Sequence, residues 1–361
     1  MRRMWVWCGA FSVLMAIGAA PIEDQSAVSK AHSILFYKGL GLHYIYRMNA
    51  DGSGQAPLND AWTCTRRLAL SPDGRTIAVV RFGGRRPSGF HIYTLGDDGG
   101  NQTWLVPGTH PAWSPTGDRM AFFYGGLCVL NTRSGAYSRL VASTIAGPYM
   151  IDGPVWSPDG TRIAFAVLTG IEQGRLLGNI YLINPDGTGC QRLTSLHRSY
   201  APTWSPDGGR IAFSGGTGLD DGLYTVNSDG AGLKRLTDRR PTRGNIAWSP
   251  DGKRIALAGL DKQLRPPFSV DTPGEARPAS KGLHVINADG SGLQWLSSTE
   301  NVWVFDVTWS PDGGRIAFSG HLWTTVDIYA INADGTGLSK LTNDGKSHAP
   351  VWAPRTPEAN N

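Results

Sequence analysis

Short apolar runs alternate with polar turns along nearly the whole chain. The runs at 316–318 and 328–331 are typical, because each is too short for a helix and is flanked by turn residues. No segment shows a sustained helical repeat of apolar residues. The pattern therefore predicts an all-β protein made of many short strands.

A ten-residue sequence motif, called the repeat motif below, recurs within this pattern and sets its period. It is clearest at 309–318, where it reads Trp-Ser-Pro-Asp-Gly-Gly-Arg-Ile-Ala-Phe. Copies of differing completeness start at Leu70, Trp113, Trp156, Trp204, Trp248 and Trp352. Successive copies are 43, 43, 48, 44, 61 and 43 residues apart. A step of this size is the length of one small antiparallel sheet in a β-propeller.

Each step contains short strands and two recurring turns. The Trp ends the first strand, and Ser-Pro-Asp-Gly turns the chain into the second. In this turn Pro fixes φ, Asp bonds forward to the backbone, and Gly accepts a positive φ. A third strand, as at 327–332, leads into the turn Asn-x-Asp-Gly-x-Gly and then into a fourth strand. The turns do not fit an EF-hand, because its ligand positions and its final Glu are missing.

These copies resemble the WD40-like repeats of the TolB family of bacterial propeller proteins. The resemblance covers residues 33–354 and implies a single all-β domain. The fold it implies is a seven-bladed β-propeller of four-stranded antiparallel blades. The motif is specific for this fold and weak for function, because propellers host many functions.

The two ends of the chain are expected to share one blade. Residues 33–38 read as a second strand that lacks a first strand before it, and 350–352 supply the missing strand. Closure of this kind leaves no free sheet edge in the ring. Six blades is the alternative count, if the poorly matching first segment does not form a sheet.

Several recurring side chains are predicted to be structural. Buried indoles hide large apolar areas, so we assign the six repeat tryptophans to packing between blades; they are Trp113, Trp156, Trp204, Trp248, Trp309 and Trp352. Cys128 and His284 replace a recurring Tyr and are expected to be packing residues, not metal ligands. The Arg of the repeat motif is expected to neutralise nearby turn aspartates at the solvated edge of the fold.

Residues 1–20 read as a secretory signal peptide or an N-terminal anchor. Arg2 and Arg3 precede an apolar stretch from Trp5 to Ile17, and small residues follow it. We therefore predict a periplasmic or secreted protein, with membrane attachment only if this segment is retained. Cys64, Cys128 and Cys190 allow at most one bridge, so no disulfide framework is expected. A net charge of +5 spread over the blades argues against nucleic-acid binding.

Because the strands of a blade alternate in direction, its two kinds of connection lie on opposite faces of the disc. The Ser-Pro-Asp-Gly and Asn-x-Asp-Gly turns share one face, and nearly all variation in length falls on the other, above all at 259–281. Variable loops on a rigid scaffold carry function, and exposed aromatic and Arg side chains are favoured at interfaces. The candidate partner-binding residues are Trp62, Arg85, Arg86, Arg175, Arg239, Arg240, Arg265, Phe268, Trp303 and Trp323.

The function predicted is a non-enzymatic scaffold that binds a protein partner of the cell envelope, as a monomer and without cofactor or metal. A direct role in the Tol–Pal system is not expected, because only about a dozen residues separate the signal segment from the first strand. The alternative is a metal-dependent lyase or a hydrolase acting on polysaccharide in the central channel. No Gly-x-Ser-x-Gly or His-Glu-x-x-His motif supports it. Four histidines near the variable face keep it open, namely His110, His197, His321 and His348.

Overall fold

The computed structural model consists of β-strands joined by turns. It describes residues 32–39, 43–63, 68–83, 89–142, 153–172, 175–217, 221–238, 240–241, 246–261, 282–296, 302–322 and 324–354. Every regular element in these ranges is a strand, and the four-stranded sheets are antiparallel. The prediction of an all-β fold of four-stranded antiparallel sheets is therefore confirmed.

One sheet contains the first and the last strand of the described chain. Its order is β3-β2-β1-β30. The strands are β1 (His32–Lys38), β2 (His43–Asn49), β3 (Ala56–Thr63) and β30 (Ser347–Pro354). In the antiparallel pair β1–β30, Ile34 lies opposite Trp352 and Leu35 opposite Val351. The truncated last copy of the repeat thus supplies the first strand of this sheet.

Two four-stranded sheets follow in chain order. The first is ordered β4-β5-β6-β7 and consists of β4 (Ala69–Leu70), β5 (Thr76–Phe82), β6 (Phe90–Gly96) and β7 (Thr103–Pro107). The second is ordered β11-β10-β9-β8 and consists of β8 (Thr109–Trp113), β9 (Arg119–Phe123), β10 (Gly126–Asn131) and β11 (Tyr137–Ala142).

The next eight strands form two units with the same order. The first comprises β12 (Val155–Trp156), β13 (Ile163–Glu172), β14 (Arg175–Ile183) and β15 (Gln191–Arg192). The second comprises β16 (Arg198–Trp204), β17 (Arg210–Gly216), β18 (Gly222–Asn227) and β19 (Lys234–Arg235). A single parallel pair, Gly178 with Arg198, joins the two units through β14 and β16.

The last two four-stranded sheets repeat the pattern. One is β21 (Ile246–Trp248), β22 (Arg254–Ala258), β24 (Leu283–Asn287) and β25 (Gln294–Trp295). The other is β26 (Trp303–Trp309), β27 (Arg315–Leu322), β28 (Thr325–Asn332) and β29 (Ser339–Lys340). A separate two-stranded pair, which the repeat did not predict, joins β20 (Arg240–Pro241) to β23 (Leu260–Asp261).

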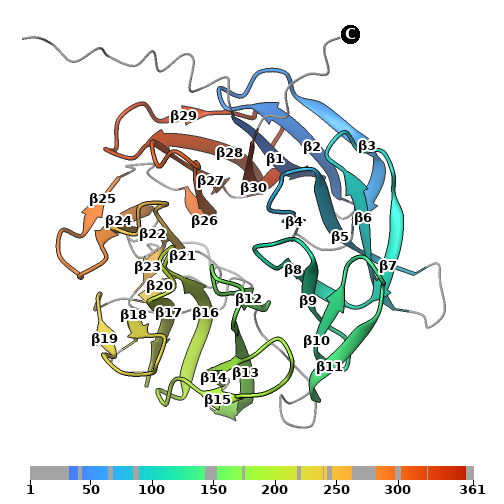
Figure 1. Ribbon diagram of the computed structural model, residues 1–361. Helices are drawn as coiled ribbons and strands as arrows, with labels where there is room; N and C mark the ends of the chain where they lie inside the picture. Colours follow the sequence, from blue (N-terminus) through green and yellow to red (C-terminus); the bar gives the residue numbers. More distant parts are fainter. Residues whose placement is uncertain are drawn as a thin grey trace, which may run out of the picture.

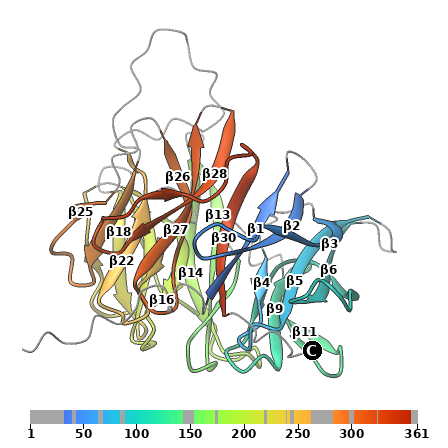
Figure 2. The same ribbon diagram turned by 90° about the horizontal axis from the view of Figure 1, so that it is seen from above.

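The sheets stand around a common centre, and the first strand of each, such as β8 or β16, lies nearest to it (Figure 1). Strands of neighbouring sheets such as β22 and β26 are in contact, and the view from above shows the strands standing between the two faces of the molecule (Figure 2). Each sheet therefore buries both of its faces against its neighbours. This explains why the second strand reads as a continuous apolar run and not as an alternation.

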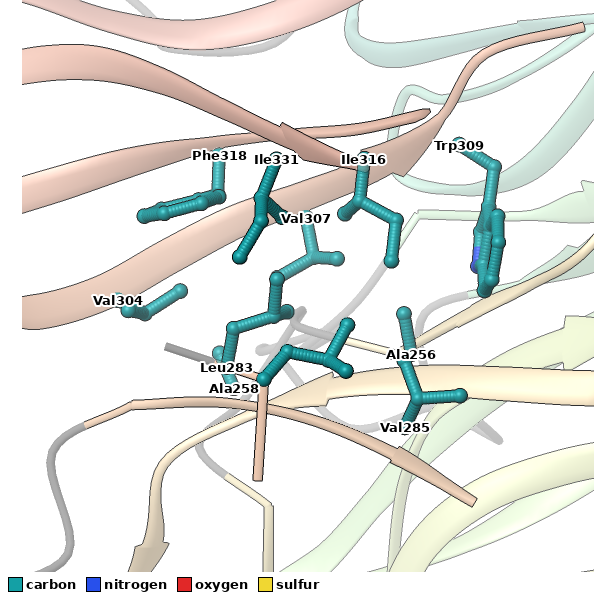
Figure 3. Close-up of a cluster of buried hydrophobic side chains, with 11 residues drawn as sticks. Ala256, Ala258, Leu283, Val285, Val304, Val307, Trp309, Ile316, Phe318 and Ile331 are labelled. Atoms are coloured by element: carbon teal, nitrogen blue, oxygen red, sulfur yellow. The ribbon is translucent and has the colours of Figure 1, made fainter. Parts of the chain in front are cut away.

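The core lies between the sheets. In the cluster of Figure 3, the sheet of β26–β29 packs on the sheet of β21–β25. Ile316 and Phe318 point into this cluster, whereas Ala317 between them packs toward β1 and β30. All three are fully buried. The short Ile-Ala-Phe run is thus shared between two inter-sheet cores.

The repeat tryptophans connect neighbouring sheets by hydrogen bonds as well as by packing. The Trp248 indole N–H donates to the carbonyl of Thr203, 3.2 Å away, on the first strand of the preceding sheet. The same bond recurs at Trp113, Trp156, Trp204 and Trp309. Four of these five indoles are buried, with exposures between 6% and 8%, and Trp113 is half-buried.

The arginine of the repeat motif also contacts the next sheet. The Arg210 guanidinium lies 5.2 Å from the centre of the Trp248 ring, and its Nη1 donates to the Ala288 carbonyl at 3.0 Å. The pattern repeats at Arg162 with Trp204 and Ser228, and at Arg254 with Trp309 and Ala333. The sequence led us to expect these arginines to neutralise nearby turn aspartates. Their charges do add to the hydrogen bonds of the turns in lowering the pKa of Asp159, Asp207 and Asp251. The sequence did not predict their second role, in which a cation–π contact and a charge-assisted hydrogen bond tie them to the neighbouring sheet.

Position 99 requires a glycine, because another sheet approaches it closely. Its φ is +85°, and a Cβ at this position would lie 1.7 Å from the Leu58 carbonyl oxygen of β3. Gly135 has a similar φ of +72° but open space around it. We expect Gly135→Ala to cost about 1–2 kcal/mol, from the left-handed backbone alone. Gly99→Ala should cost roughly 1–3 kcal/mol more, because the backbone of β3 has to move.

Urea unfolding of the two variants measures this difference directly. Both substitutions add one methyl group at a left-handed position, so the comparison isolates the contact between sheets. Equal costs would mean that the approach of β3 to Gly99 does not contribute to stability.

Candidate functional site

The connections of the sheets divide the molecule into two faces. We call the face with the Ser-Pro-Asp-Gly and Asn-x-Asp-Gly turns the turn face. The loop face carries the connections that follow β1, β5, β9, β13, β17, β22 and β27, and those that lead into β4, β8, β12, β16, β21, β26 and β30. The two faces differ in their chemistry.

The turn face is held by local hydrogen bonds that leave little room for variation. The Ser205 hydroxyl donates to Asp207 at 2.5 Å, and the Arg210 N–H donates to the Ser205 oxygen at 2.9 Å. The bond from Ser205 is the largest cause that lowers the pKa of Asp207, followed by the N–H of Gly209. The side chains of this turn thus form their hydrogen bonds within the turn itself.

Irregular backbone gathers in the strands nearest the centre. His110, Ala201, Asp306 and Ala349 have positive φ values of 56°, 51°, 51° and 53°. Each lies three residues before a repeat Trp, at a shift of register in β8, β16, β26 or β30. Bulges of this kind bend a strand and re-aim its side chains near functional sites. Here they occur in four of the described first strands, β8, β16, β26 and β30.

Of the ten candidate partner-binding residues, Trp303 alone has a described side chain. It is half-buried and lies opposite His321 in the pair β26–β27. For Trp62, Arg175 and Arg240 only the backbone is described, in β3, β14 and β20. The remaining candidates lie outside the described residues, namely Arg85, Arg86, Arg239, Arg265, Phe268 and Trp323.

The four histidines of the alternative function have separate surroundings. His110 lies 5.6 Å from the Phe123 ring, and His321 lies 4.9 Å from the Phe305 ring. His197 is exposed, and His348 is buried against His43. Across the described ranges, no three His, Cys, Asp or Glu side chains come together in a way that could hold a metal ion.

The two substituted tyrosine positions are packed. Cys128 is fully buried, its Sγ lies 3.5 Å from the Tyr124 carbonyl, and burial raises the pKa of its thiol. His284 stacks on the Trp295 ring, with 6.3 Å between ring centres and 13° between planes.

The loop face also presents an aromatic pair that the sequence analysis did not single out. Phe82 and Phe90 form the last residue pair of β5 and β6. Their rings meet edge to face at 5.2 Å, yet 56% of Phe82 and 44% of Phe90 is exposed. The sequence does contain a signal for this pair. Phe82 directly precedes Gly83 and Phe90 directly follows Gly89, so both lie at the ends of one connection. Exposed aromatic pairs of this kind mark interaction surfaces.

A cavity adjoins this pair. It has a volume of ≈ 200 Å³ and lies between the sheet of β4–β7 and the sheet of β8–β11. Gly89, Phe90, Pro107, Gly108, Thr109, Phe123, Tyr124 and Gly125 line it. None of these side chains is charged. Position 108 has no room for a side chain, because a Cβ there would lie 2.7 Å from the Phe122 ring. The cavity and the exposed phenylalanines together form the candidate site.

Comparison with known proteins places this architecture in a family. The family model described as TolB beta propeller domain matches residues 84–274, which is more than half of the chain. The chain belongs to this family. A search among curated proteins gave no match for the TolB-like chain. No helix that could cross a lipid bilayer occurs among its described residues.

Solved structures similar to this TolB-like propeller include enzymes and other proteins. TolB from Acinetobacter baumannii is 17% identical, with a TM-score of 0.52, covering 94% of this chain and 87% of that one. Oligogalacturonate lyase from Vibrio parahaemolyticus is 12% identical, with a TM-score of 0.59 and 88% of each chain covered. The periplasmic gluconolactonase of Pseudomonas aeruginosa is 15% identical, with a TM-score of 0.57, covering 89% and 99%. Identities this low show the shared fold alone.

Proposed function

We propose that this chain is a periplasmic or secreted, non-enzymatic scaffold that binds a protein partner of the cell envelope through its loop face. The scaffold is a seven-bladed ring, in which β12–β15 and β16–β19 are separate blades and β30 completes the blade of β1. The signal-like segment 1–20 directs export, and the mature protein acts as a monomer without metal or cofactor.

The exposed Phe82–Phe90 pair beside an uncharged cavity is the observation that carries the proposal. Aromatic side chains contribute large contact area at interfaces, and the cores of interfaces are poor in charged groups. A cavity of ≈ 200 Å³ next to the pair accommodates a side chain of the partner. On the turn face, by contrast, the polar side chains have their hydrogen bonds satisfied within the turns.

Affinity capture from an envelope extract tests the site. We expect the double variant Phe82→Ser with Phe90→Ser to lose at least tenfold of the captured partner, since removal of two interface anchors typically exceeds 1.4 kcal/mol. Its fold should remain intact, because both side chains are about half exposed and belong to none of the buried clusters between the sheets.

The matched control is Leu233→Ser with Leu293→Ser. These leucines are 45% and 46% exposed and follow the turns of the opposite face, so the loss of apolar surface is similar. Equal capture by both double variants would place the partner site elsewhere. A stoichiometric divalent metal in the purified protein would contradict the non-enzymatic assignment.

A further inference from the structure

Two histidines lie buried where the last strand joins the first sheet. His348 of β30 is 1% exposed and His43 of β2 is 6% exposed. The His348 Nε2 is 3.3 Å from the His43 Nδ1, and the rings meet edge to face at 4.8 Å. Tyr37 of β1 lies opposite His348, with ring centres 5.8 Å apart. The pair therefore connects β30 to β2, and Tyr37 of the intervening β1 lies against His348.

The contacts of the His43 Nδ1 favour one arrangement of protons on the two rings. The His43 Nδ1 lies 3.1 Å from the Gly39 carbonyl oxygen, which only accepts hydrogen bonds, so this nitrogen carries a hydrogen. The same N–H faces the His348 Nε2, which must then be unprotonated to accept it. A proton added to the His348 Nε2 would place two N–H groups against each other in a buried site, so the hydrogen bond between the rings would be lost.

A neighbouring contact, between the sheet of β30 and the sheet of β26–β29, lacks an indole hydrogen bond that five other contacts between sheets have. Within the described part of the chain, the buried Trp352 indole N–H has no hydrogen-bond partner. The equivalent indole N–H of Trp248 donates to the preceding sheet at 3.2 Å. The joint between β26–β29 and the sheet of β30 is therefore held by fewer hydrogen bonds of this kind.

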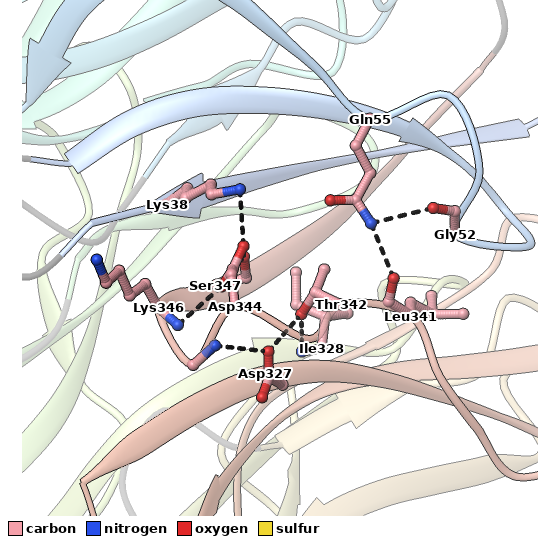
Figure 4. A network of polar contacts seen from close by, with 11 residues as sticks. Lys38, Gly52, Gln55, Asp327, Ile328, Leu341, Thr342, Asp344, Lys346 and Ser347 are labelled. Carbon is pink, nitrogen blue, oxygen red and sulfur yellow. Dashed lines mark hydrogen bonds and ion pairs between the residues drawn. The ribbon is translucent and has the colours of Figure 1, made fainter.

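The carboxylates near the pair already have other partners. Asp344 accepts from the Lys38 ammonium at 2.9 Å and from the Ser347 hydroxyl (Figure 4). Asp327 pairs with the Lys340 ammonium at 2.9 Å. Asp306 accepts from the Ser319 hydroxyl at 2.9 Å. The other titratable groups on β1, β2, β27 and β28, and directly before β30, are His32, Tyr37, Tyr44, Tyr46, Arg47, Arg315, His321, Tyr329 and Lys346.

We propose that His43 and His348 form an acid-sensitive latch that opens the ring at the β1–β30 joint. Imidazole takes up its second proton near pH 6.5. Protonation of the His348 Nε2 breaks the bond between the rings and releases β30 before the other sheets separate. This conformational role is independent of the partner-binding function proposed above.

Hydrogen exchange on the intact protein tests the latch. Uptake of one proton on opening lowers protection by up to about tenfold per pH unit below the pKa of the free imidazole. We expect the protection factors of 347–353 and 33–38 to fall about fivefold from pH 6.5 to pH 5.5, because pH 6.5 equals the pKa of the free imidazole and the full tenfold step is reached only further below it. The protection of 303–309, the equivalent first strand of the preceding sheet, should not change. A uniform fall, or none in β30, would overturn the proposal.

Variants separate the latch from general acid sensitivity. His348→Gln or His43→Gln removes a titrating group and should abolish the local pH dependence of β30. His110→Gln is the matched control, because it alters a half-buried histidine of the inner strand β8 and should keep the wild-type behaviour. If neither latch variant folds, the wild-type exchange profile decides alone. Retained pH dependence in a folded latch variant would contradict the mechanism.

Discussion

Replacing Trp248 by Ala will lower the free energy of unfolding by about 3–5 kcal/mol. The indole is 8% exposed and packs with Ile255 and Leu257 in the core between two sheets. Its loss leaves a cavity, removes the bond to the Thr203 carbonyl, and takes the aromatic surface away from the Arg210 guanidinium. Denaturation in urea, followed by the fluorescence of the remaining tryptophans, measures the change.

Phenylalanine variants separate the hydrogen bond from the packing. Trp248→Phe removes the N–H that donates to Thr203. Loss of this hydrogen bond should lower the free energy of unfolding by about 0.5–1.5 kcal/mol. Trp352→Phe is the matched variant, since the N–H of Trp352 is buried and has no acceptor in the described part of the chain. Trp352→Phe should therefore be the milder of the two. The reverse order would contradict the assignment of the bond.

The fold was predictable because its signals are local. Ser205 and Asp207 form their turn with residues at most five positions away, and the spacing of the copies sets the length of each sheet. The same locality allowed the pairing of the chain ends to be anticipated. Residues 33–38 needed a first strand, and Trp352 belonged to a copy without a second strand.

Contacts between sheets could not be predicted in this way. Arg210 has Asp207 as its nearest opposite charge in the sequence, and the Ala288 carbonyl that it binds is 78 residues away. The positive φ of Ala201 and Asp306 has no sequence signal either, because neither residue is a glycine. Bulges at these positions follow from the packing of the first strands around the centre.

The candidate site was predicted at the level of a face and not of residues. Choosing exposed Arg and aromatic side chains in the longest connections selected positions that, apart from Trp303, lack a described side chain. Phe82 and Phe90 lie in regular strands, where apolar residues are usually assigned to the core. Their exposure results from their position at the end of the hairpin, beyond the cover of the neighbouring sheets.

Acidification below about pH 4 will reduce the stability of the whole fold steeply, in a pH range well below that of the histidine latch. Hydrogen bonds within the turns are the largest cause of a lowered pKa at nine aspartates, namely Asp51, Asp73, Asp118, Asp159, Asp186, Asp207, Asp251, Asp289 and Asp334.

The sign follows from proton uptake. A carboxyl whose pKa is lower in the folded chain stabilises the fold above the pKa of the unfolded chain, near 3.8. That stabilisation is lost as the pH falls through the lower, folded value, because unfolding then takes up protons. The free energy of unfolding, measured in urea, should be nearly constant above about pH 5 and fall between about pH 4 and 2. Ser205→Ala supplies the local test, because its cost should shrink once Asp207 is protonated. A cost that is equal at pH 6 and at pH 2 would show that the bond to the ionised carboxylate does not stabilise the turn.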